Sequence, residues 1–434
     1  PRGRRPACGS SGLPGAARWQ PGRPAAGHTA PATPQRKVMA MAQAAPPAPP
    51  VDCHRVDISE DRLGELLGAE LAVLSGQVLT PLSLRQVLDA NTPHKAAELM
   101  RRELPKRFAH RIRQIEEWPG WQDVPELEKL HELYFCSFRE LSLADPSGGL
   151  GPFTEAVQRH KRRMQRVLPM LMEAMHELQE DGCALSHTAV DSWLDRFLLA
   201  RIGTEMLSTQ FLATTSPIGK GIAYRACCPA RIVQRAAMRV RSLCAQEFPW
   251  LREEDVRIDV ESVRHDPDGP GDAHITYVPQ YLFYIVVELL KNSARATVLT
   301  ASDSRRPFER RPITISVCAD DKSLVIRVED RAGGIPAKSL DKVWSYLYTT
   351  APARSDSWEH QGTPLAGFGV GLPLSRLYAR YLGGNLRLIS MPGQGTLAYV
   401  NLLRLEEEAF EGLQTWSGTS PLHEHEDSCD ALEL

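Results

Sequence analysis

The hydrophobic period of this chain changes once, near residue 229, and that change limits the folds open to it. Before residue 229, apolar residues recur every three to four positions, as Leu104, Phe108 and Ile112 do, which indicates amphipathic helices. After it, short runs alternate between apolar and polar residues or are rich in β-branched residues, which indicates strands. We therefore predict an α+β protein in which a helical domain precedes a domain with a sheet.

The first part, residues 56–228, is expected to be an antiparallel helical bundle, because its amphipathic segments are long and their connections short. Thr80-Pro81 before an apolar run is a helix-start signal, and Pro105 is expected to kink or end its helix. The second part, residues 229–405, is expected to be an α/β sandwich, a mixed sheet with helices on one face. Its strands are predicted in VRIDVES, HITYVP, ITISVCAD, SLVIRVED, NLRLISM and TLAYVNLLRL.

The two ends of the chain differ from the rest in composition. Residues 1–55 are predicted to be disordered, since the first 50 hold 11 of the 33 prolines, seven basic side chains and no acidic one. An Arg-rich segment without acids is typical of an organelle transit peptide; its prolines disfavour the usual amphipathic helix, and a start at Met39 or Met41 would remove it. Residues 406–434 form an acidic tail. His423, His425 and Cys429 in it could bind a metal, but the acidic and polar composition favours a solvated segment.

Charge, hydropathy and cysteine usage argue against several classes of protein. Without residues 1–50 the chain has 44 basic and 53 acidic side chains, a net charge of −9, which disfavours nucleic-acid binding. The longest apolar stretch, 281–290, is half the roughly 20 residues that a membrane span needs. None of the nine cysteines has CxxC spacing, and Cys227 and Cys228 are adjacent, so we expect reduced thiols.

The segment YIVVELLKNSARAT is expected to be a helix that carries reactive groups. Glu288 and Asn292 are four residues apart and so share one face. Glu288 has apolar neighbours, and a carboxylate there can accept a proton from a hydroxyl nucleophile. The Asn292 amide oxygen is a hard, neutral ligand that suits Mg²⁺. Taken alone, the pair is more often an exposed acid and amide on an amphipathic helix.

Asp330 ends the predicted strand SLVIRVED and leads into a turn with two glycines. A carboxylate fixed there can accept a hydrogen bond from an exocyclic amine such as that of adenine. The glycines allow the backbone to approach a flat ring closely. Taken alone, this pattern is usually an ordinary turn.

Three glycines, Gly367, Gly369 and Gly371, precede a helix that is expected to begin near Pro373. A glycine-rich loop before a helix N-terminus offers backbone N–H groups to phosphates. No Gly-Lys-Ser/Thr follows, so the loop is not a Walker A motif, and it lacks the preceding first strand of a Rossmann fold. Residues 348–366, just before it, are placed to act as a lid over a nucleotide.

The order of these segments is more specific than any one of them, and it resembles the GHKL-type ATP-binding domain of histidine kinases, gyrase and Hsp90. Residues 78–403 further resemble one family, the mitochondrial kinases of pyruvate dehydrogenase and of branched-chain 2-oxoacid dehydrogenase. The resemblance is carried by TPLSLRQ, RRELPKRFAHRI, LYFCSFREL, VVELLKNSARAT, VEDRAGGIP, YLYTTAP and GTPLAGFGVGLPLSRLYARYLGG.

The resemblance implies an ATP- and Mg²⁺-dependent protein serine kinase of the mitochondrial matrix. It implies that the kinase phosphorylates and so inactivates the E1α subunit of the pyruvate dehydrogenase complex, is a homodimer, and binds the E2 lipoyl domain through its regulatory bundle. By resemblance, Glu288 is the general base, Asn292 the Mg²⁺ ligand and Asp330 the adenine-binding carboxylate. The other matching nucleotide positions are Arg295, Thr349, Thr350 and Thr396, with Gly367, Phe368, Gly369, Val370, Gly371 and Leu372 in the phosphate loop.

Several positions depart from the family pattern. Tyr284 stands where pyruvate dehydrogenase kinases usually carry His, and a phenol cannot tune a carboxylate as an imidazolium would. Ala332 and Leu397 replace a Gly and an Asp near the expected nucleotide. Met164 replaces a His and Glu205 an Arg in the bundle. No Asp-Trp pair ends the chain, which puts the family's cross-subunit anchor in question.

Three alternatives stay open at this point. The lid and glycine loop favour pyruvate dehydrogenase as the substrate, whereas Tyr284 favours the branched-chain enzyme. A protein histidine kinase is a second alternative, although no acceptor His is evident on a dimerisation helix. A non-catalytic GHKL scaffold is the third, suggested by Ala332, Leu397 and the missing C-terminal anchor.

Overall fold

The computed structural model describes residues 58–180, 187–264, 273–300, 308, 311–320, 322–346, 348–349, 369–404 and 411–412. The predicted transit peptide, most of the acidic tail and most of the predicted lid lie outside these residues, as do Thr350, Gly367 and Phe368. No helix within the described ranges is both long and apolar enough to cross a membrane.

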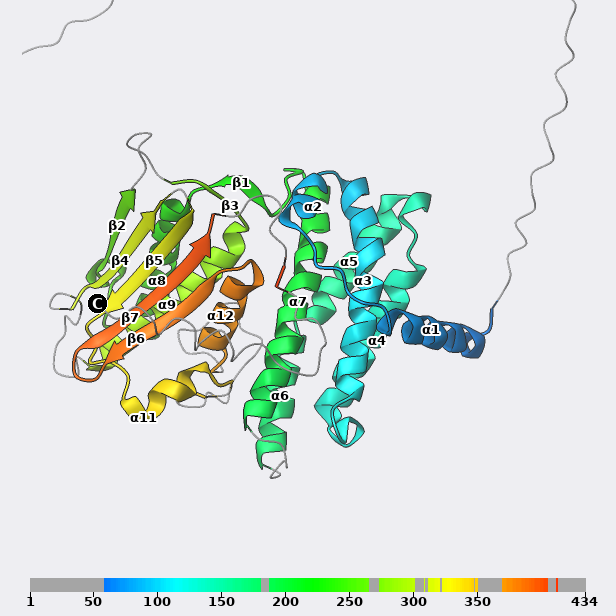
Figure 1. The fold of residues 1–434 in the computed structure, drawn as a ribbon, viewed down its shortest axis with the longest axis horizontal. Coiled ribbons are helices and arrows are strands. Elements are labelled where there is room, and N and C mark those ends of the chain that lie inside the picture. Colours follow the sequence, from blue (N-terminus) through cyan, green and yellow to red (C-terminus); the bar gives the residue numbers. More distant parts are fainter. Residues whose placement is uncertain are drawn as a thin grey trace, which may run out of the picture. The chain divides into compact units, whose positions relative to one another are not determined.

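The N-terminal part of the described chain is helical (Figure 1). Its helices are α1 (Glu60–Ser75), α2 (Leu84–Asp89), α3 (Pro93–Glu116), α4 (Pro125–Leu143), α5 (Leu150–Met164), α6 (Val167–Glu180) and α7 (His187–Thr215), with 3-10 turns η1 (Trp121–Asp123) and η2 (Pro146–Gly148). Helix α3 packs against α1, α4 and α7, and α5 packs against α4 and α7. The long helices thus share one apolar core, as expected for a bundle.

Helix α3 shows how the sequence sets a helix of this bundle. The Thr92 hydroxyl caps its start by accepting a hydrogen bond from the backbone N–H of Lys95, and Pro93 occupies the first turn, where no N–H is needed. The helix continues through Pro105, so this proline does not end it. Leu104 and Phe108, on either side, are at most 1% exposed; burial of this face offsets the roughly 3 kcal/mol that an interior proline costs.

The C-terminal part contains a five-stranded sheet with the strand order β2-β4-β5-β7-β6. Strands β2 and β4 are parallel and the other pairs are antiparallel. These strands are β2 (Ile258–Arg264), β4 (Ile313–Ala319), β5 (Ser323–Asp330), β6 (Asn385–Met391) and β7 (Gly395–Leu403). A separate antiparallel pair joins β1 (Tyr224–Cys227), which precedes the predicted boundary at residue 229, to β3 (Ile275–Tyr277).

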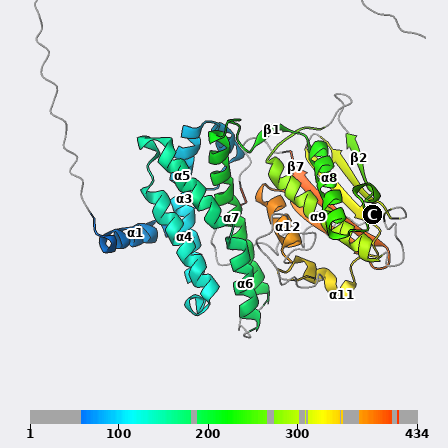
Figure 2. The same cartoon turned by 180° about the vertical axis from the view of Figure 1, so that it is seen from behind.

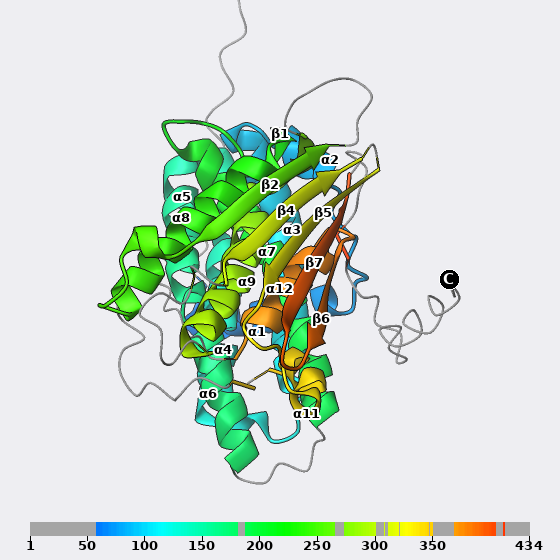
Figure 3. The same ribbon diagram turned by 90° about the vertical axis from the view of Figure 1, so that its left-hand side faces the viewer.

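Helices α8 (Pro229–Glu247), α9 (Pro279–Thr300) and α12 (Gly371–Tyr381) all lie on one face of the sheet (Figures 1, 2 and 3). The short elements η3 (Glu253–Asp255), α11 (Ala337–Leu340) and η4 (Asp341–Trp344) lie in connections. The predicted α+β class, a helical bundle followed by a mixed sheet with helices on one face, is confirmed.

The alternation of buried and less buried side chains along β5 places the Asp330 carboxylate on the face that the helices cover. Leu324, Ile326, Val328 and Asp330 are buried, while the residues between them are less so. Because side chains of a strand alternate between two faces, Asp330 shares the face of the three apolar residues. It therefore lies beneath α9 at the end of the strand.

Helix α7 of the bundle contacts the sheet domain close to the predicted lid. Asp191 accepts hydrogen bonds from the Ser345 hydroxyl (2.7 Å) and the Tyr346 backbone N–H (3.0 Å). Asp195, one turn further along α7, accepts one from the Tyr346 hydroxyl (2.6 Å). The bundle thereby fixes the residues that immediately precede Tyr348.

Candidate functional site

Helix α9 carries an ion pair that is almost fully buried. The Lys291 ammonium lies 2.9 Å from Oε1 of Glu288, and the two side chains are 2% and 8% exposed. Val286, Val287, Leu289 and Leu290 are buried as well, and α12 packs against α9 beside Glu288. Burial of a carboxylate is costly unless the group is paired or hydrogen-bonded, and Lys291, three residues along the helix, supplies a charged partner here. Sequence reasoning identified Glu288 and missed Lys291, although the spacing is typical of a helical ion pair.

The start of α12 approaches the other oxygen of Glu288. A Cβ atom at Gly371 would lie 2.6 Å from Oε2 of Glu288, so a side chain at residue 371 would collide with the carboxylate. The φ of Gly369 is +78°, a left-handed conformation that favours glycine. Two of the three predicted glycines thus have a physical reason, and the loop turns directly beside the predicted base.

The predicted phosphate loop leads into the N-terminus of α12. Its N-cap residue, Val370, makes no side-chain hydrogen bond to the first turn. Val370 is buried, whereas Gly371 and Leu372 are partly exposed. Uncapped N–H groups and the positive end of the helix dipole together favour an anionic group such as a phosphate.

Asp330 lies at the other end of the site, where the described residues offer it neutral donors and no cation within hydrogen-bond distance. Its Oδ2 accepts a hydrogen bond from the Ser293 hydroxyl (2.9 Å). Its Oδ1 accepts two from the backbone N–H groups of Ala332 (3.1 Å) and Thr396 (3.3 Å). Burial raises the pKa of Asp330, and these three hydrogen bonds oppose that shift. Sequence reasoning missed Ser293, because nothing local links it to Asp330.

The turn after Asp330 is pressed against the β6–β7 hairpin. Gly334 has a φ of +71°, and a Cβ atom there would lie 2.3 Å from the carbonyl oxygen of Met391. Ala332, which replaces the first glycine of the family pattern, keeps both backbone groups bonded: its N–H to Asp330 (3.1 Å) and its carbonyl to the Thr300 hydroxyl (2.9 Å). The turn therefore forms with alanine at this position.

Tyr284 lies one turn before Glu288 on α9, with its ring centroid 4.9 Å from that of Tyr378 on α12. Burial, and then the Glu288 carboxylate, raise the pKa of Tyr284 well above its usual value of 10. The phenol therefore stays neutral and adds no positive charge beside Glu288. This is the physical consequence of having tyrosine in place of histidine.

The remaining predicted residues are spread around these groups. Asn292 is exposed on α9, one turn from Glu288, so its amide is accessible to a hydrated ion. Arg295 is partly exposed on the next turn, and Thr349 is exposed after η4. Thr396 is partly exposed, and its hydroxyl lies 3.0 Å from that of Ser390.

The donor set of α9 fits Mg²⁺. This ion takes oxygen ligands and commonly uses one or two protein side chains together with water and substrate phosphates. Asn292 offers one such oxygen. Within the described residues, no group of three or more His, Cys, Asp and Glu side chains is arranged to hold a metal, so any metal there would depend on the phosphates.

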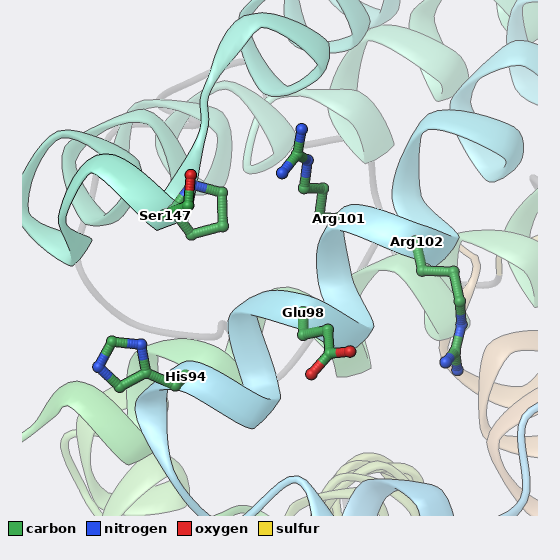
Figure 4. Close-up of a pocket in the computed structure, with 6 residues that line it drawn as sticks. His94, Glu98, Arg101, Arg102 and Ser147 are labelled. Atoms are coloured by element: carbon green, nitrogen blue, oxygen red, sulfur yellow. The ribbon is translucent and has the colours of Figure 1, made fainter. Parts of the chain in front are cut away.

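A pocket in the bundle is separate from these residues (Figure 4). It is lined by His94, Glu98, Arg101 and Arg102 of α3 and by Pro146 and Ser147 of η2. Arg101 pairs with Asp145 (2.8 Å) and Arg102 with Glu103 (2.9 Å), and the two guanidinium groups point in different directions (Figure 4). They do not converge on one anion.

Two family comparisons cover the two parts of the chain. Residues 81–223 match the family described as mitochondrial branched-chain alpha-ketoacid dehydrogenase kinase. Residues 277–407 match the family described as histidine kinase-, DNA gyrase B- and HSP90-like ATPase. The second match contains α9, Asp330 and the start of α12.

Similar proteins span most of the chain. Mitochondrial pyruvate dehydrogenase (acetyl-transferring) kinase isozyme 3 of Homo sapiens is 33% identical over 364 residues, 79% of this chain and 87% of its own. Isozyme 4 of Rattus norvegicus is 31% identical, over 82% of this chain and 89% of its own. The mitochondrial kinase of Arabidopsis thaliana is 33% identical, over 71% and 85%.

Proposed function

Because this chain belongs to the family of mitochondrial pyruvate dehydrogenase and branched-chain 2-oxoacid dehydrogenase kinases, we propose that it phosphorylates a serine of an E1α subunit with ATP. The observation that carries this proposal is the approach of Gly371 to the buried Glu288–Lys291 pair. It supports the proposal because a helix N-terminus, which can bind phosphate, would then adjoin a carboxylate that can act as a base. We further propose that the reaction takes place in the mitochondrial matrix, since the similar proteins are mitochondrial kinases.

In the proposed reaction, Glu288 accepts the proton of the serine hydroxyl as its oxygen attacks the γ-phosphorus. The bond from that phosphorus to the β–γ bridging oxygen breaks, and ADP leaves. Lys291 holds Oε1 of Glu288 (2.9 Å) and so fixes the direction of the carboxylate. Backbone N–H groups at residues 369–372 bind the phosphates.

The adenine of the nucleotide would bind further along α9, beside Ser293. Asp330, fixed by Ser293 and two backbone N–H groups, accepts a hydrogen bond from the adenine amine. Thr396 lies on the adenine side, while Arg295, Thr349, Thr350, Gly367 and Phe368 keep the roles that the family resemblance implies. Asn292 would hold Mg²⁺, which when bound neutralises charge on the phosphates.

We propose pyruvate dehydrogenase as the substrate complex, because the similar proteins named above are kinases of that enzyme. Branched-chain 2-oxoacid dehydrogenase is the second candidate, favoured by the family match of residues 81–223 and by Tyr284. Incubation of the chain with Mg-ATP and each purified E1 in parallel tests the choice. Faster labelling of the branched-chain E1α would reverse it.

Two measurements test the reaction class itself. Label on E1α that survives acid supports a serine kinase, whereas acid-labile label on this chain alone would indicate a histidine kinase. Calorimetry with Mg-ATP tests the scaffold alternative, because a chain that binds no nucleotide cannot be a kinase. Binding of an isolated E2 lipoyl domain to the bundle is expected and can be measured in the same way.

We also propose a homodimer formed through the sheet face that α8, α9 and α12 leave uncovered. Ile389 and Met391 of β6 are 52% and 63% exposed there, and neighbouring exposed apolar side chains mark an interaction site. Replacing Ile389 and Met391 by Asp should give monomers in sedimentation analysis. If the double variant remains dimeric, this face of the sheet is not the dimer interface.

A further inference from the structure

A second buried carboxylate, Glu411, lies outside the proposed site. It belongs to the segment that follows β7, and its side chain is fully buried. Its guanidinium partner, Arg107 of α3, is 2% exposed. Removing a charged pair from water to this extent is costly unless further hydrogen bonds compensate it, so each contact of Glu411 is informative.

The carboxylate of Glu411 joins three distant parts of the chain. Arg107 donates two hydrogen bonds to it, from Nη1 to Oε2 (3.2 Å) and from Nη2 to Oε1. The backbone N–H of Leu82, just before α2, donates to Oε1 (2.9 Å). The hydroxyl of Tyr381, the last residue of α12, donates to Oε2. One side chain thereby ties the bundle to α12.

Backbone hydrogen bonds reinforce the same arrangement. The N–H of Glu411 donates to the carbonyl of Leu82 (2.9 Å), and the N–H of Gly412 donates to the carbonyl of Tyr381 (2.8 Å). Residues 411–412 therefore bridge the bundle and α12 through main chain as well as side chain.

Space for this cluster is provided by a glycine of helix α7. A Cβ atom at Gly203 would lie 2.7 Å from Nη1 of Arg107 and 3.0 Å from both Oε2 of Glu411 and the Tyr381 hydroxyl. Glycine weakens a helix interior, so its presence here is explained by the close approach of the three polar groups.

The charges of the cluster are complementary. Burial alone would lower the pKa of Arg107, but the Glu411 carboxylate raises it above its usual value. Burial, and then Glu411, raise the pKa of Tyr381 well above 10. The carboxylate of Glu411 thus lies between the Arg107 guanidinium and the Tyr381 phenol, and it has no other charged side chain as a hydrogen-bond partner within the described residues.

Helix α12 links this cluster to the proposed site. It has 11 residues, about 16 Å at 1.5 Å per residue. Its first residue, Gly371, is the one that approaches Oε2 of Glu288, and its last residue is Tyr381. One continuous helix therefore connects the Glu411 cluster with the residue that adjoins Glu288.

We propose that Glu411 is a positioning residue for phosphoryl transfer: by holding Tyr381 against Arg107, it keeps α12 and its phosphate loop in register with Glu288. Docking of residues 411–412 then determines how well the loop binds the nucleotide. The effect on phosphoryl transfer rests on the proposed kinase function. The packing of α12 against residues 411–412 does not, and it can be measured without nucleotide.

The test compares the wild-type chain with Tyr381→Phe and Glu411→Gln. Tyr381→Phe removes one hydroxyl and leaves the Arg107–Glu411 pair intact, so it should fold. We expect faster amide hydrogen exchange in α12 without nucleotide, and an Mg-ATP Kd raised roughly tenfold, the equivalent of one charge-assisted hydrogen bond. Glu411→Gln should have the larger effect, because it leaves Arg107 buried without a counter-charge.

Glu140→Gln is the matched control. Glu140 accepts hydrogen bonds from Arg159 and Arg163 within the bundle and is partly exposed, so its loss should lower the unfolding temperature without changing α12 exchange or the Kd. Unchanged α12 exchange in Tyr381→Phe would overturn the inference, as would an equal rise of the Kd in the control. A wild-type chain that binds no Mg-ATP would refute the proposed function, whereas faster α12 exchange in Tyr381→Phe would still support docking through Glu411.

Discussion

The helical bundle and the nucleotide-binding domain both bury polar side chains, but they surround them differently. In the bundle, His160 of α5 is 1% exposed and lies against Phe108, with the ring centroids 5.0 Å apart. Its Nδ1 has no hydrogen-bond partner among the described residues. Burial, and then nearby Arg163, lower its pKa to about 3. This imidazole is neutral and acts as a packing group.

In the nucleotide-binding domain, Glu288 and Asp330 are each 6% exposed, yet each is held by specific donors. Lys291 donates to one oxygen of Glu288, and the other lies beside Gly371. Asp330 is held by Ser293 and by backbone N–H groups. Burial alone therefore does not identify a reactive group. A buried group that is oriented by donors and adjoins a glycine loop is the better indicator.

Among substitutions near these carboxylates, we expect replacement of the exposed Asn292 to have the largest effect on Mg-ATP binding. Asn292→Ala removes the oxygen proposed to hold Mg²⁺, so calorimetry should detect no Mg-ATP binding. Asn401→Ala, in β7 of the same domain, is the control and should bind normally. Unchanged affinity in Asn292→Ala would remove the metal assignment.

The next largest effect is expected for Glu288→Gln, on the rate of phosphoryl transfer. Glu288→Gln keeps the shape of the side chain but cannot accept the serine proton, and loss of a general base lowers rates by roughly 10²–10⁴-fold. The substitution also leaves Lys291 buried without a counter-charge, so the unfolding temperature should fall, whereas the Kd for Mg-ATP should change little. Single-turnover assays with E1 measure the effect, with Glu253→Gln on the surface as the control. A near-wild-type rate would mean that phosphoryl transfer needs the bound substrates to be oriented but needs no general base. Glu288 would then be a structural group, as His160 is.

The smallest predicted effect concerns stability and the bundle. The pKa of His160 is lowered from 6.5 to about 3 in the folded chain, so its contribution to stability is complete above pH 6.5 and is lost as the pH falls towards 3. Between pH 7 and pH 5 the loss from this one group is about 2 kcal/mol. Denaturant unfolding of His160→Leu should lose less stability over this interval than the wild type. Equal losses would mean that the histidine is solvated.

Several features of the site could be predicted because they are local in sequence. The four-residue spacing of Glu288 and Asn292 fixes their shared helix, and the alternation that ends at Asp330 fixes the end of a strand. The glycines before α12 predicted a loop that feeds a helix. Pro105 was harder to interpret, because whether a proline ends a helix depends on how much apolar surface its neighbours bury.

Other features depend on segments that are far apart in the chain, and these the tertiary structure decided. Ser293 meets Asp330 from 37 residues away, and Glu411 meets Leu82 from 329 residues away. The contact of Gly371 with Glu288 likewise exists only because α12 packs against α9. Periodicity determines which face of an element is buried, but packing decides which element covers it. The sequence by itself determined the two-part fold and the reactive residue types, and packing alone decided which of those residues meet.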